Sequence, residues 1–283
     1  MRILLIGRNG QLGWELERAL VPLGEVIALD RVQLDLSDVA AIRRMTRDAA
    51  PRVIVNAAGY TAVDRAESEP ALAASINGLA PGILGEEARR SDALLVHYST
   101  DYVFDGEKGD PYREEDSPNP ISVYGQSKLE GERAIRASGC RHVILRTSWV
   151  YAARGNNFLR TVLRLARERG ELSVVGDQTG NPTAAHELAR GTAALLRFAP
   201  ADGTYHLSGA GETSWYEFAR AIVALSGHGS TRVRRITTQE YPTAARRPRY
   251  SVLSNEKIRR VAGIALPHWR ESLAAVYSTL AAD

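Results

Sequence analysis

Short runs of apolar residues recur through the first half of the sequence, and each run is followed by a segment with helical periodicity. The runs are residues 3–6, 26–29, 53–55, 94–96 and 143–145. Continuous apolar strands that alternate with helices are typical of a parallel sheet that helices cover on both faces. The sequence therefore predicts an α/β fold with a doubly wound parallel sheet of the Rossmann type.

Beyond residue 148 this alternation weakens, and segments rich in Gly, Pro, Asn and Thr separate the predicted elements. Helices are predicted at 12–20, 39–48, 71–90, 124–137, 158–169, 187–198 and 215–226, with one further strand at 172–175. A chain of 283 residues can form two lobes with a cleft between them. We expect a first domain over 1–149 and a smaller C-terminal lobe over 150–283, with segments of about 156–200 returning to the first domain.

A glycine-rich turn, with Gly7, Gly10 and Gly13, directly follows the first predicted strand. Glycines there let the backbone approach a pyrophosphate, and the helix that follows supplies amide donors. The spacing GxxGxxG differs from the usual GxGxxG, and an ordinary strand-to-helix turn would also contain glycine. The order of strand, turn, helix and second strand favours a phosphate cradle, which makes residues 1–149 a dinucleotide-binding domain.

Asp30 ends the second predicted strand, about twenty residues after the turn. A carboxylate there accepts hydrogen bonds from an adenosine ribose, which favours NAD. The neighbouring Arg31 could instead meet the 2′-phosphate of NADP. Both NADPH and NADH therefore stay open as cofactors.

Tyr124 and Lys128 lie four residues apart in a predicted helix and so share one face. A lysine ammonium near a tyrosine favours the phenolate and brings the pKa of the phenol toward the range of acid–base catalysis. Thr100 lies just beyond the strand at 94–96, where side chains of a parallel sheet face a bound ligand. Alternatively, Tyr124 and Lys128 are a pair on the protein surface, and the Thr100 hydroxyl only forms hydrogen bonds within its own turn. The glycine turn upstream favours the interpretation of these three residues as a catalytic set.

Composition excludes several other classes of protein. Net charge is +3, and opposite charges alternate along the chain, which argues against a nucleic-acid partner. The one cysteine, Cys140, cannot form an internal disulfide, and no Cys and His residues have the spacing of a zinc site. No apolar stretch approaches the roughly 18 residues of a membrane span. We expect a cytoplasmic protein without a membrane partner.

Taken together, the motifs resemble the extended short-chain dehydrogenase/reductases and, within them, the family of dTDP-4-dehydrorhamnose reductases. The resemblance rests on the glycine turn, Asn-Ala-Ala-Gly-Tyr-Thr-Ala-Val-Asp at 56–64, Ser-Thr-Asp-Tyr-Val-Phe at 99–104 and Tyr-Gly-x-Ser-Lys at 124–128. It continues through 146–151, 155–158, 177–183 and 247–253. It therefore spans nearly the whole chain.

The resemblance implies that NADPH or NADH reduces the 4-keto group of dTDP-4-dehydro-L-rhamnose (dTDP-6-deoxy-L-lyxo-4-hexulose) to dTDP-L-rhamnose. Tyr124 would donate the proton, Lys128 would hold the nicotinamide ribose, and Thr100 would orient the reacting oxygen. The residues implied to line the cofactor are Gly10, Gln11, Leu12, Asp30, Asp35, Leu36, Gly59, Tyr60, Thr61 and Tyr98. Asp101 and Trp149 would touch the substrate, and the C-terminal lobe would bind it.

Arg247 lies in the basic segment 246–249. An arginine fork suits phosphate oxygens, so we expect Arg247 to contact the substrate diphosphate. A solvated basic loop is the alternative.

Some members of the family form dimers through magnesium held by acidic residues, and Glu15 matches the first of these positions. His186 and Thr279 stand where the other acidic residues would be, although Glu187 is adjacent to His186. Magnesium prefers oxygen ligands. We therefore expect no magnesium bridge, in a protein that is a monomer or a homodimer.

Two other functions stay open. One is a related sugar-nucleotide reductase or epimerase, because the lobe that selects the sugar does not reveal its choice in sequence. The other is a non-catalytic regulatory subunit that binds the dinucleotide. The joint presence of Tyr124, Lys128 and Thr100 favours an enzyme.

Overall fold

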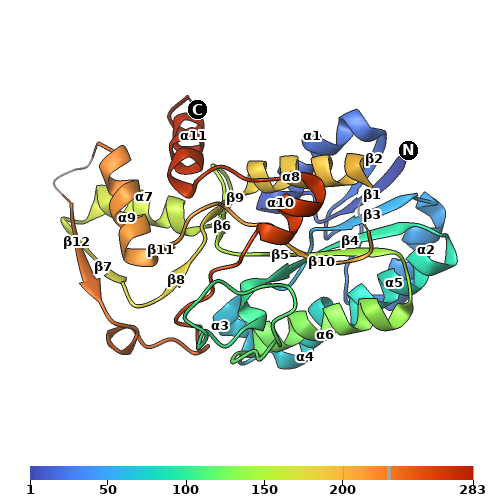
Figure 1. The fold of residues 1–283 in the computed structure, drawn as a ribbon, viewed down its shortest axis with the longest axis horizontal. Helices are drawn as coiled ribbons and strands as arrows, with labels where there is room; N and C mark the ends of the chain where they lie inside the picture. The colour runs from blue at the N-terminus through green and yellow to red at the C-terminus, as the bar shows by residue number, and fades with distance from the viewer. Residues whose placement is uncertain (200, 228–230, 283) are drawn as a thin grey trace.

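A six-stranded parallel sheet lies at the centre of the larger part of the molecule, in the order β2-β1-β3-β4-β5-β10 (Figure 1). Its strands are β1 (Arg2–Ile6), β2 (Glu25–Leu29), β3 (Val53–Asn56), β4 (Leu94–Thr100), β5 (His142–Thr147) and β10 (Gly203–His206). The strand order reverses between β1 and β3, and in such sheets ligands bind beyond the carboxyl ends of the strands at that point. The predicted fold class is confirmed.

The computed structural model describes residues 1–199, 201–227 and 231–282. Pro200, residues 228–230 and Asp283 belong to the lobe predicted over 150–283 and lie outside the described residues.

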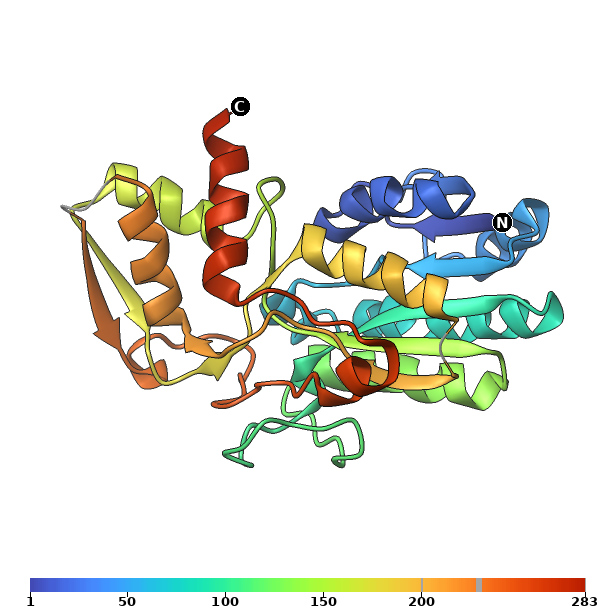
Figure 2. The same ribbon diagram turned by 45° about the horizontal axis from the view of Figure 1, so that its top comes forward.

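Two layers of helices cover the sheet, and alternate side chains of each strand face them. In β1, Ile3 and Leu5 are buried in one apolar cluster, whereas Leu4 and Ile6 are buried in the other. The first layer contains α1 (Gln11–Leu20), α8 (Ala185–Phe198) and α10 (Glu256–Ala262). The second contains α2 (Val39–Ala49), α5 (Ala80–Arg90) and α6 (Val123–Ser138). Figure 2 shows the blue α1 and yellow α8 on one side of the sheet and the green α6 on the other. Burial on both faces explains why the strands are continuous apolar runs.

The helix predicted over 71–90 is divided in the structure into α4 (Pro70–Ala74), a π-helical turn η2 (Ser75–Leu79) and α5; the short α3 (Val63–Ala66) precedes them. Within η2, Asn77 is buried, and its side chain accepts the N–H of Tyr60 at 2.8 Å and donates to the Tyr60 carbonyl at 2.9 Å. It also donates to the Ser127 hydroxyl of α6 at 3.0 Å. The π-turn therefore fixes the loop after β3 against α6, in keeping with the frequent place of such turns at functional sites.

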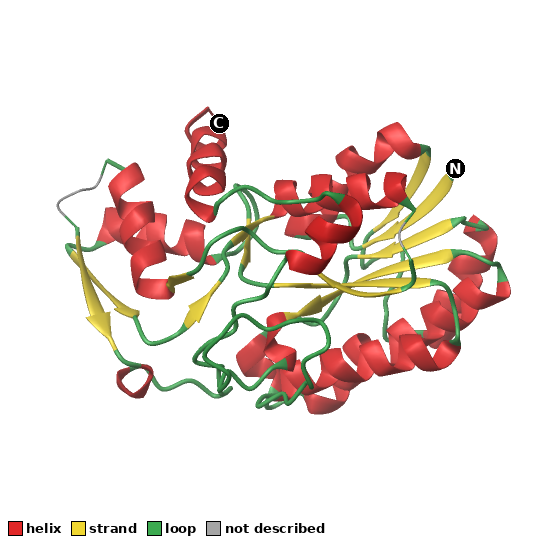
Figure 3. Cartoon of the chain, in the orientation of Figure 1, coloured by secondary structure: helices red, strands yellow, loops and turns green. Residues whose placement is uncertain are grey.

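A third cluster of buried apolar side chains forms the core of the smaller lobe, on the left in Figures 1 and 3. Its helices are α7 (Phe158–Glu168), α9 (Trp215–Leu225) and α11 (Trp269–Ala282). Beside them, β7 (Glu171–Val175) pairs in parallel with β12 (Arg232–Ile236). Shorter pairs are β6 (Val150–Tyr151) with β9 (Thr183–Ala184) and β8 (Thr179–Gly180) with β11 (Thr213–Ser214). Single 3₁₀ turns are η1 (Val21–Leu23), η3 (Asp101–Val103) and η4 (Thr238–Glu240).

The chain passes between the lobes more than once after β5. Within the segment 156–200, α8 packs in the helix layer that contains α1, whereas α7 belongs to the core of the smaller lobe. Strand β10 and helix α10 also return to the larger part of the molecule. The division into 1–149 and 150–283 stays a prediction.

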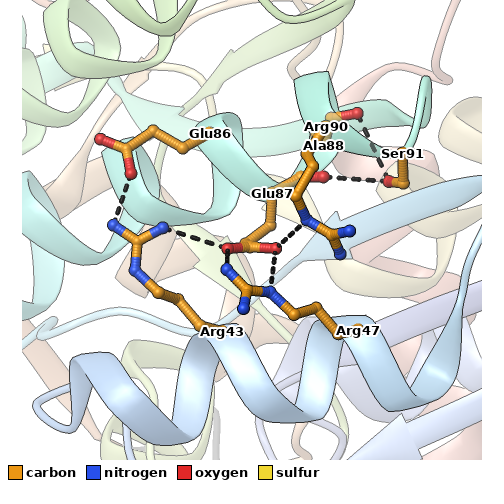
Figure 4. Close-up of polar contacts among 7 residues, drawn as sticks. All are labelled: Arg43, Arg47, Glu86, Glu87, Ala88, Arg90 and Ser91. Carbon is orange, nitrogen blue, oxygen red and sulfur yellow. Dashed lines mark hydrogen bonds and ion pairs between the residues drawn. The ribbon is translucent and has the colours of Figure 1, made fainter.

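A buried carboxylate, Glu87, joins α2 to α5 through arginines (Figure 4). Its side chain is 1% exposed. Arg47 donates to it at 2.9 and 2.6 Å, Arg90 at 2.8 Å and Arg43 at 3.0 Å. The hydrogen bonds from Arg47, and then from Arg90 and Arg43, lower the pKa of Glu87 to about 2, although burial alone would raise it. The cluster therefore ties two neighbouring helices of one layer together.

We expect Glu87→Gln to lower the free energy of unfolding by about 2 kcal/mol, because these guanidinium groups lose a charged acceptor. Glu86→Gln is the matched control: Glu86 is 53% exposed and pairs only with Arg43 in this cluster, so the loss should stay below about 0.5 kcal/mol. Folding lowers the pKa of Glu87 from 4.5 to about 2, so its contribution is present above pH 4.5 and disappears as the pH falls toward 2. Urea unfolding at neutral and acidic pH measures both effects; equal losses in the two variants would contradict this account.

Candidate active site

A cleft of about 670 Å³ lies beyond the carboxyl ends of β1, β3 and β4, with residues of both lobes in its walls. The predicted site residues that line it are Gly7, Gly10, Gln11, Leu12, Asp30, Asp35, Leu36, Gly59, Tyr60, Thr61, Tyr98, Thr100, Asp101, Tyr124, Lys128 and Trp149. Two predicted residues, Gly13 and Arg247, do not line it. The structure thus brings together residues that are spread over the first 149 positions.

The glycine turn forms one end of the cleft. Gly7 has a φ of +93°, and a Cβ atom there would lie 2.9 Å from the backbone nitrogen of Ala58. At Gly13 a Cβ would lie 2.0 Å from the carbonyl oxygen of Gly7, so this glycine lets α1 pack onto the turn. Helix α1 begins at Gln11, and its first N–H groups have no partner within the helix. The turn therefore has the shape and the free donors that fit a pyrophosphate.

Asp30 lies at the next part of the cleft and is already engaged by its own turn. Its Oδ1 accepts the backbone N–H groups of Val32 and Gln33 at 2.9 and 3.0 Å, and its Oδ2 accepts from the Asn9 side chain at 3.1 Å. The neighbouring Arg31 side chain is 79% exposed and lies 3.8 Å from Asp35. The carboxylate is thus held in place, while the guanidinium beside it is loosely held.

Tyr124 lies in the first turn of α6, which packs unusually closely on the end of β4. The Ser122 hydroxyl caps the helix by accepting the N–H of Gly125 at 3.2 Å. A Cβ atom on Gly125 would lie 2.2 Å from the carbonyl oxygen of Tyr102 in η3. The Tyr124 ring meets the Tyr102 ring edge-to-face, with centroids 5.7 Å apart. Glycine at position 125 therefore lets Tyr124 reach the Thr100 end of β4.

The ionisation of Tyr124 differs from the expectation that Lys128 lowers its pKa. Burial raises the pKa of Tyr124 to about 12; a hydrogen bond with Thr100 lowers it, and the charge of Asp101 raises it. Lys128 is turned toward β4, where its Nζ donates to the carbonyl of Tyr98 at 2.6 Å and lies 3.2 Å from Nε2 of His97. In this structure the lysine therefore stabilises contacts with the strand rather than a phenolate.

Unpartnered oxygen atoms point to where a ligand would form hydrogen bonds. Among the described residues, Oγ1 of Thr147 is buried without a hydrogen-bond partner, and Oδ2 of Asp101 is buried with no partner other than the nearby Ser251 side chain; both residues line the cleft. Burial raises the pKa of Asp101 to about 7. The Thr100 hydroxyl donates to the other oxygen of Asp101 at 3.0 Å. Polar groups buried without partners are rare in proteins, which favours a ligand contact here.

Trp149 forms the wall of the cleft on the side of the smaller lobe. It stacks on Trp215, with ring centroids 3.5 Å apart and planes inclined by 4°. Its φ is +45°, a left-handed conformation that is uncommon for a bulky residue. Strain of this kind clusters at ligand sites.

Arg247 is occupied by a different partner from the one that the sequence suggested. Its guanidinium forms a fork with Asp64, at 3.1 and 2.7 Å, and also donates to the Thr243 hydroxyl at 2.5 Å and the carbonyl of Ala245 at 3.0 Å. The hydrogen bond from Arg247 lowers the pKa of Asp64. The arginine therefore links the C-terminal segment to α3 next to the cleft.

The residues at the expected magnesium positions have partners within the chain. His186 lies 3.0 Å from Glu187, and the Thr279 hydroxyl donates to the carbonyl of Ala275 at 3.1 Å. Burial raises the pKa of Glu15, while the charges of His186 and nearby arginines lower it. Within residues 1–199, 201–227 and 231–282, no three or more His, Cys, Asp or Glu side chains are grouped so that they could hold a metal. The absence of a magnesium bridge between two copies of the chain stays a prediction.

Several side chains of the cleft were not predicted. Thr147, Asn156, Asn157 and Trp215 all line it, and Asn157 donates to the Gln11 side chain at 2.8 Å. The first three lie inside the family motifs at 146–151 and 155–158, and these motifs could have identified them as cleft residues. Trp215 offered no such signal, because in the sequence it only begins an amphipathic helix.

Comparisons with known proteins agree with this architecture. The family model described as RmlD substrate binding domain matches residues 1–282. A dTDP-4-dehydrorhamnose reductase of Burkholderia thailandensis is 50% identical over 285 residues, which cover 95% of this chain and 96% of the relative. The crystal structure of a dTDP-4-dehydrorhamnose reductase from Clostridium acetobutylicum has a TM-score of 0.96 at 40% identity and covers 99% of this chain and 100% of that one.

A dTDP-4-dehydrorhamnose reductase from Bacillus anthracis, solved in complex with NADP, has a TM-score of 0.93 at 36% identity, with coverages of 98% and 99%. Among the helices that the structure describes, none combines the length and apolar character needed to cross a membrane. The chain therefore belongs to the dTDP-4-dehydrorhamnose reductase family.

Proposed function

We propose that the protein is an NAD(P)H-dependent oxidoreductase that reduces the 4-keto group of dTDP-4-dehydro-L-rhamnose to give dTDP-L-rhamnose. The observation that carries this proposal is the meeting of Tyr124, Thr100 and Lys128 in one cleft with the glycine turn. The relatives that bear this enzyme name cover nearly the full chain. A cytoplasmic site of action fits the class of reaction.

The chain's own groups account for the proton that the reduction needs. The glycine turn and the loop after β3 would hold a nicotinamide dinucleotide, which would supply the hydride. Tyr124, whose raised pKa keeps its hydroxyl protonated at neutral pH, donates that proton to the oxygen on carbon 4 as the carbonyl becomes an alcohol. Thr100 orients the same oxygen, and Asp101 and Trp149 hold the sugar.

We expect Tyr124→Phe to lower kcat by at least about 100-fold, because a positioned general acid contributes about 10²- to 10⁴-fold. Tyr277→Phe, on α11 away from the cleft, is the control and should retain activity. The assay is the oxidation of NADPH and of NADH with dTDP-6-deoxy-L-lyxo-4-hexulose and with a panel of other nucleotide-linked keto sugars. Turnover of another sugar would favour a related reductase or epimerase, and no turnover with any of them would favour a dinucleotide-binding subunit.

We further propose that Arg31 meets the 2′-phosphate of NADPH, since its guanidinium lines the cleft beside Asp30 with only a long contact to Asp35. Charge-assisted hydrogen bonds to phosphate are worth about 1.5–3 kcal/mol. Arg31→Ala should therefore raise the KM for NADPH by about tenfold or more and change the KM for NADH by less than about twofold. An equal change for both cofactors would contradict this role.

Arg247 is proposed to reach the substrate diphosphate by leaving its fork with Asp64. We expect Arg247→Ala to raise the KM for the sugar nucleotide by about tenfold, because a charged contact is lost. Asp64→Asn weakens the competing fork and should leave that KM unchanged or lower. Equal increases in both variants would instead mean that the Asp64–Arg247 pair only shapes the cleft.

A further inference from the structure

A buried histidine, His97, lies directly behind the catalytic lysine. It is 1% exposed in the middle of β4 and does not line the cleft. The parallel register places it opposite Asn56 of β3, whose side-chain nitrogen lies 3.1 Å from Nδ1 of the ring. On the other side of the ring, Nε2 lies 3.2 Å from Nζ of Lys128. The imidazole therefore bridges an amide and an amine, away from substrate and cofactor.

Asn56 determines which ring nitrogen carries the proton. Its Oδ1 accepts the backbone N–H of Ala58 at 3.2 Å, so its amide N–H₂ must face the histidine. The reversed amide would place two donors against each other at Ala58. Nδ1 of His97 is thus the acceptor, and a neutral ring then carries its proton on Nε2. Burial, together with the charge of Lys128, lowers the pKa of His97 and keeps the ring neutral.

The proton on Nε2 points at Lys128, and this orientation favours the amine form of the lysine over its ammonium form. An ammonium has only donors, whereas the free amine has one lone pair that can accept Nε2–H. The same Nζ donates to the carbonyl of Tyr98 at 2.6 Å, which the amine can also do. A hydrogen bond to the neutral form of a base lowers its pKa.

The charges around Lys128 act in opposite directions. Burial lowers the pKa of Lys128 to about 8, and the carboxylate of Glu132, one turn along α6, raises it. Glu132 is itself held by Arg146, at 2.8 Å through two nitrogens, and by the Ser99 hydroxyl. His97 and Tyr98 face the amine from β4.

This proposal rests on the function proposed above. We propose that His97 is a positioning residue that stabilises the amine form of Lys128 after the lysine has returned a proton to Tyr124. It does so in the tautomer that Asn56 sets, with the proton on Nε2. Reduction breaks the O–H bond of Tyr124 and forms the O–H bond of the product. The phenolate then regains a proton that the Lys128 ammonium releases, passed through water in the cleft because Nζ itself is turned toward the Tyr98 carbonyl. The lone pair that remains on Nζ accepts Nε2–H of His97. Solvent restores the proton to Lys128 before the next turnover.

The tautomer is tested directly by nitrogen NMR of the full-length protein labelled with ¹⁵N-histidine. The signal of His97 is assigned by its loss in His97→Gln. We expect a protonated Nε2 and an unprotonated Nδ1 between pH 6 and 9. A protonated Nδ1, or a ring protonated on both nitrogens, would overturn the proposal whether or not the protein reduces a sugar nucleotide.

The role in turnover is tested by the pH dependence of kcat in two matched variants. His97→Leu removes the donor, whereas His97→Gln places an amide N–H₂ near the position of Nε2. We expect the wild type to lose activity above about pH 8. In His97→Leu the pH at which kcat is lost should rise by about one unit. In the same variant kcat should fall about tenfold, with KM nearly unchanged. His97→Gln should behave like the wild type.

If kcat falls equally in both variants and its decline at high pH stays where it is in the wild type, His97 has a merely structural role and the proposal is overturned. If His97→Leu does not fold, the proposal is supported by two results together: a wild-type kcat and pH profile in His97→Gln, and a protonated Nε2 in the NMR spectrum. A protonated Nδ1 rejects the proposal in that case too. A wild type that reduces no sugar nucleotide would instead defeat the proposed function, while the tautomer measurement stands separately.

Discussion

The active site depends on the close packing of α6 against β4 and the turns beside it. Two glycines of α6 make this possible: a Cβ atom on Gly125 would lie 2.2 Å from the Tyr102 carbonyl oxygen, and one on Gly131 would lie 2.1 Å from that of Asn77. Lys128, between them, is thereby pressed against the strand and donates to the Tyr98 carbonyl. A side chain larger than hydrogen at either position would push the helix away and move Tyr124 from Thr100.

Lysine is rare in this chain, which meets nearly all of its need for cations with arginine. The structure gives a physical reason for the exception at position 128. A compact amine with a movable proton fits between His97 and the Tyr98 carbonyl, whereas a guanidinium stays charged and needs a wider, planar set of acceptors. An arginine is used where a fixed charge is needed: Arg146 of β5 forms two hydrogen bonds with the buried Glu132, which lies one turn along α6 from Lys128. The pKa of Glu132, about 2 in this setting, keeps that carboxylate charged.

Local patterns in the sequence were enough to predict the strands β1 to β5 and most of the helices. Together with the family resemblance they named about half of the residues that line the cleft. They did not predict contacts between distant segments. The fork between Arg247 and Asp64 joins positions 183 apart, and an isolated arginine cluster does not reveal such a partner. His97 likewise looks like one polar residue in a strand until the β3–β4 register places Asn56 beside it. Strand β12, with three arginines among its five residues, lacks the apolar run that identified β1 to β5 and β7.

The edge strand β10 has a consequence for how the molecule is made. It pairs in parallel with β5, yet it follows β5 in the chain by more than fifty residues, after α7, β7 and α8. During synthesis from the N-terminus, the first five strands emerge while β5 still presents an open row of N–H and C=O groups, the kind of edge that templates aggregation. Strand β10 covers β5 only after α7, β7 and α8 have been translated. Because α8, β10 and α10 return to the larger lobe, no single cut in the chain separates the two lobes.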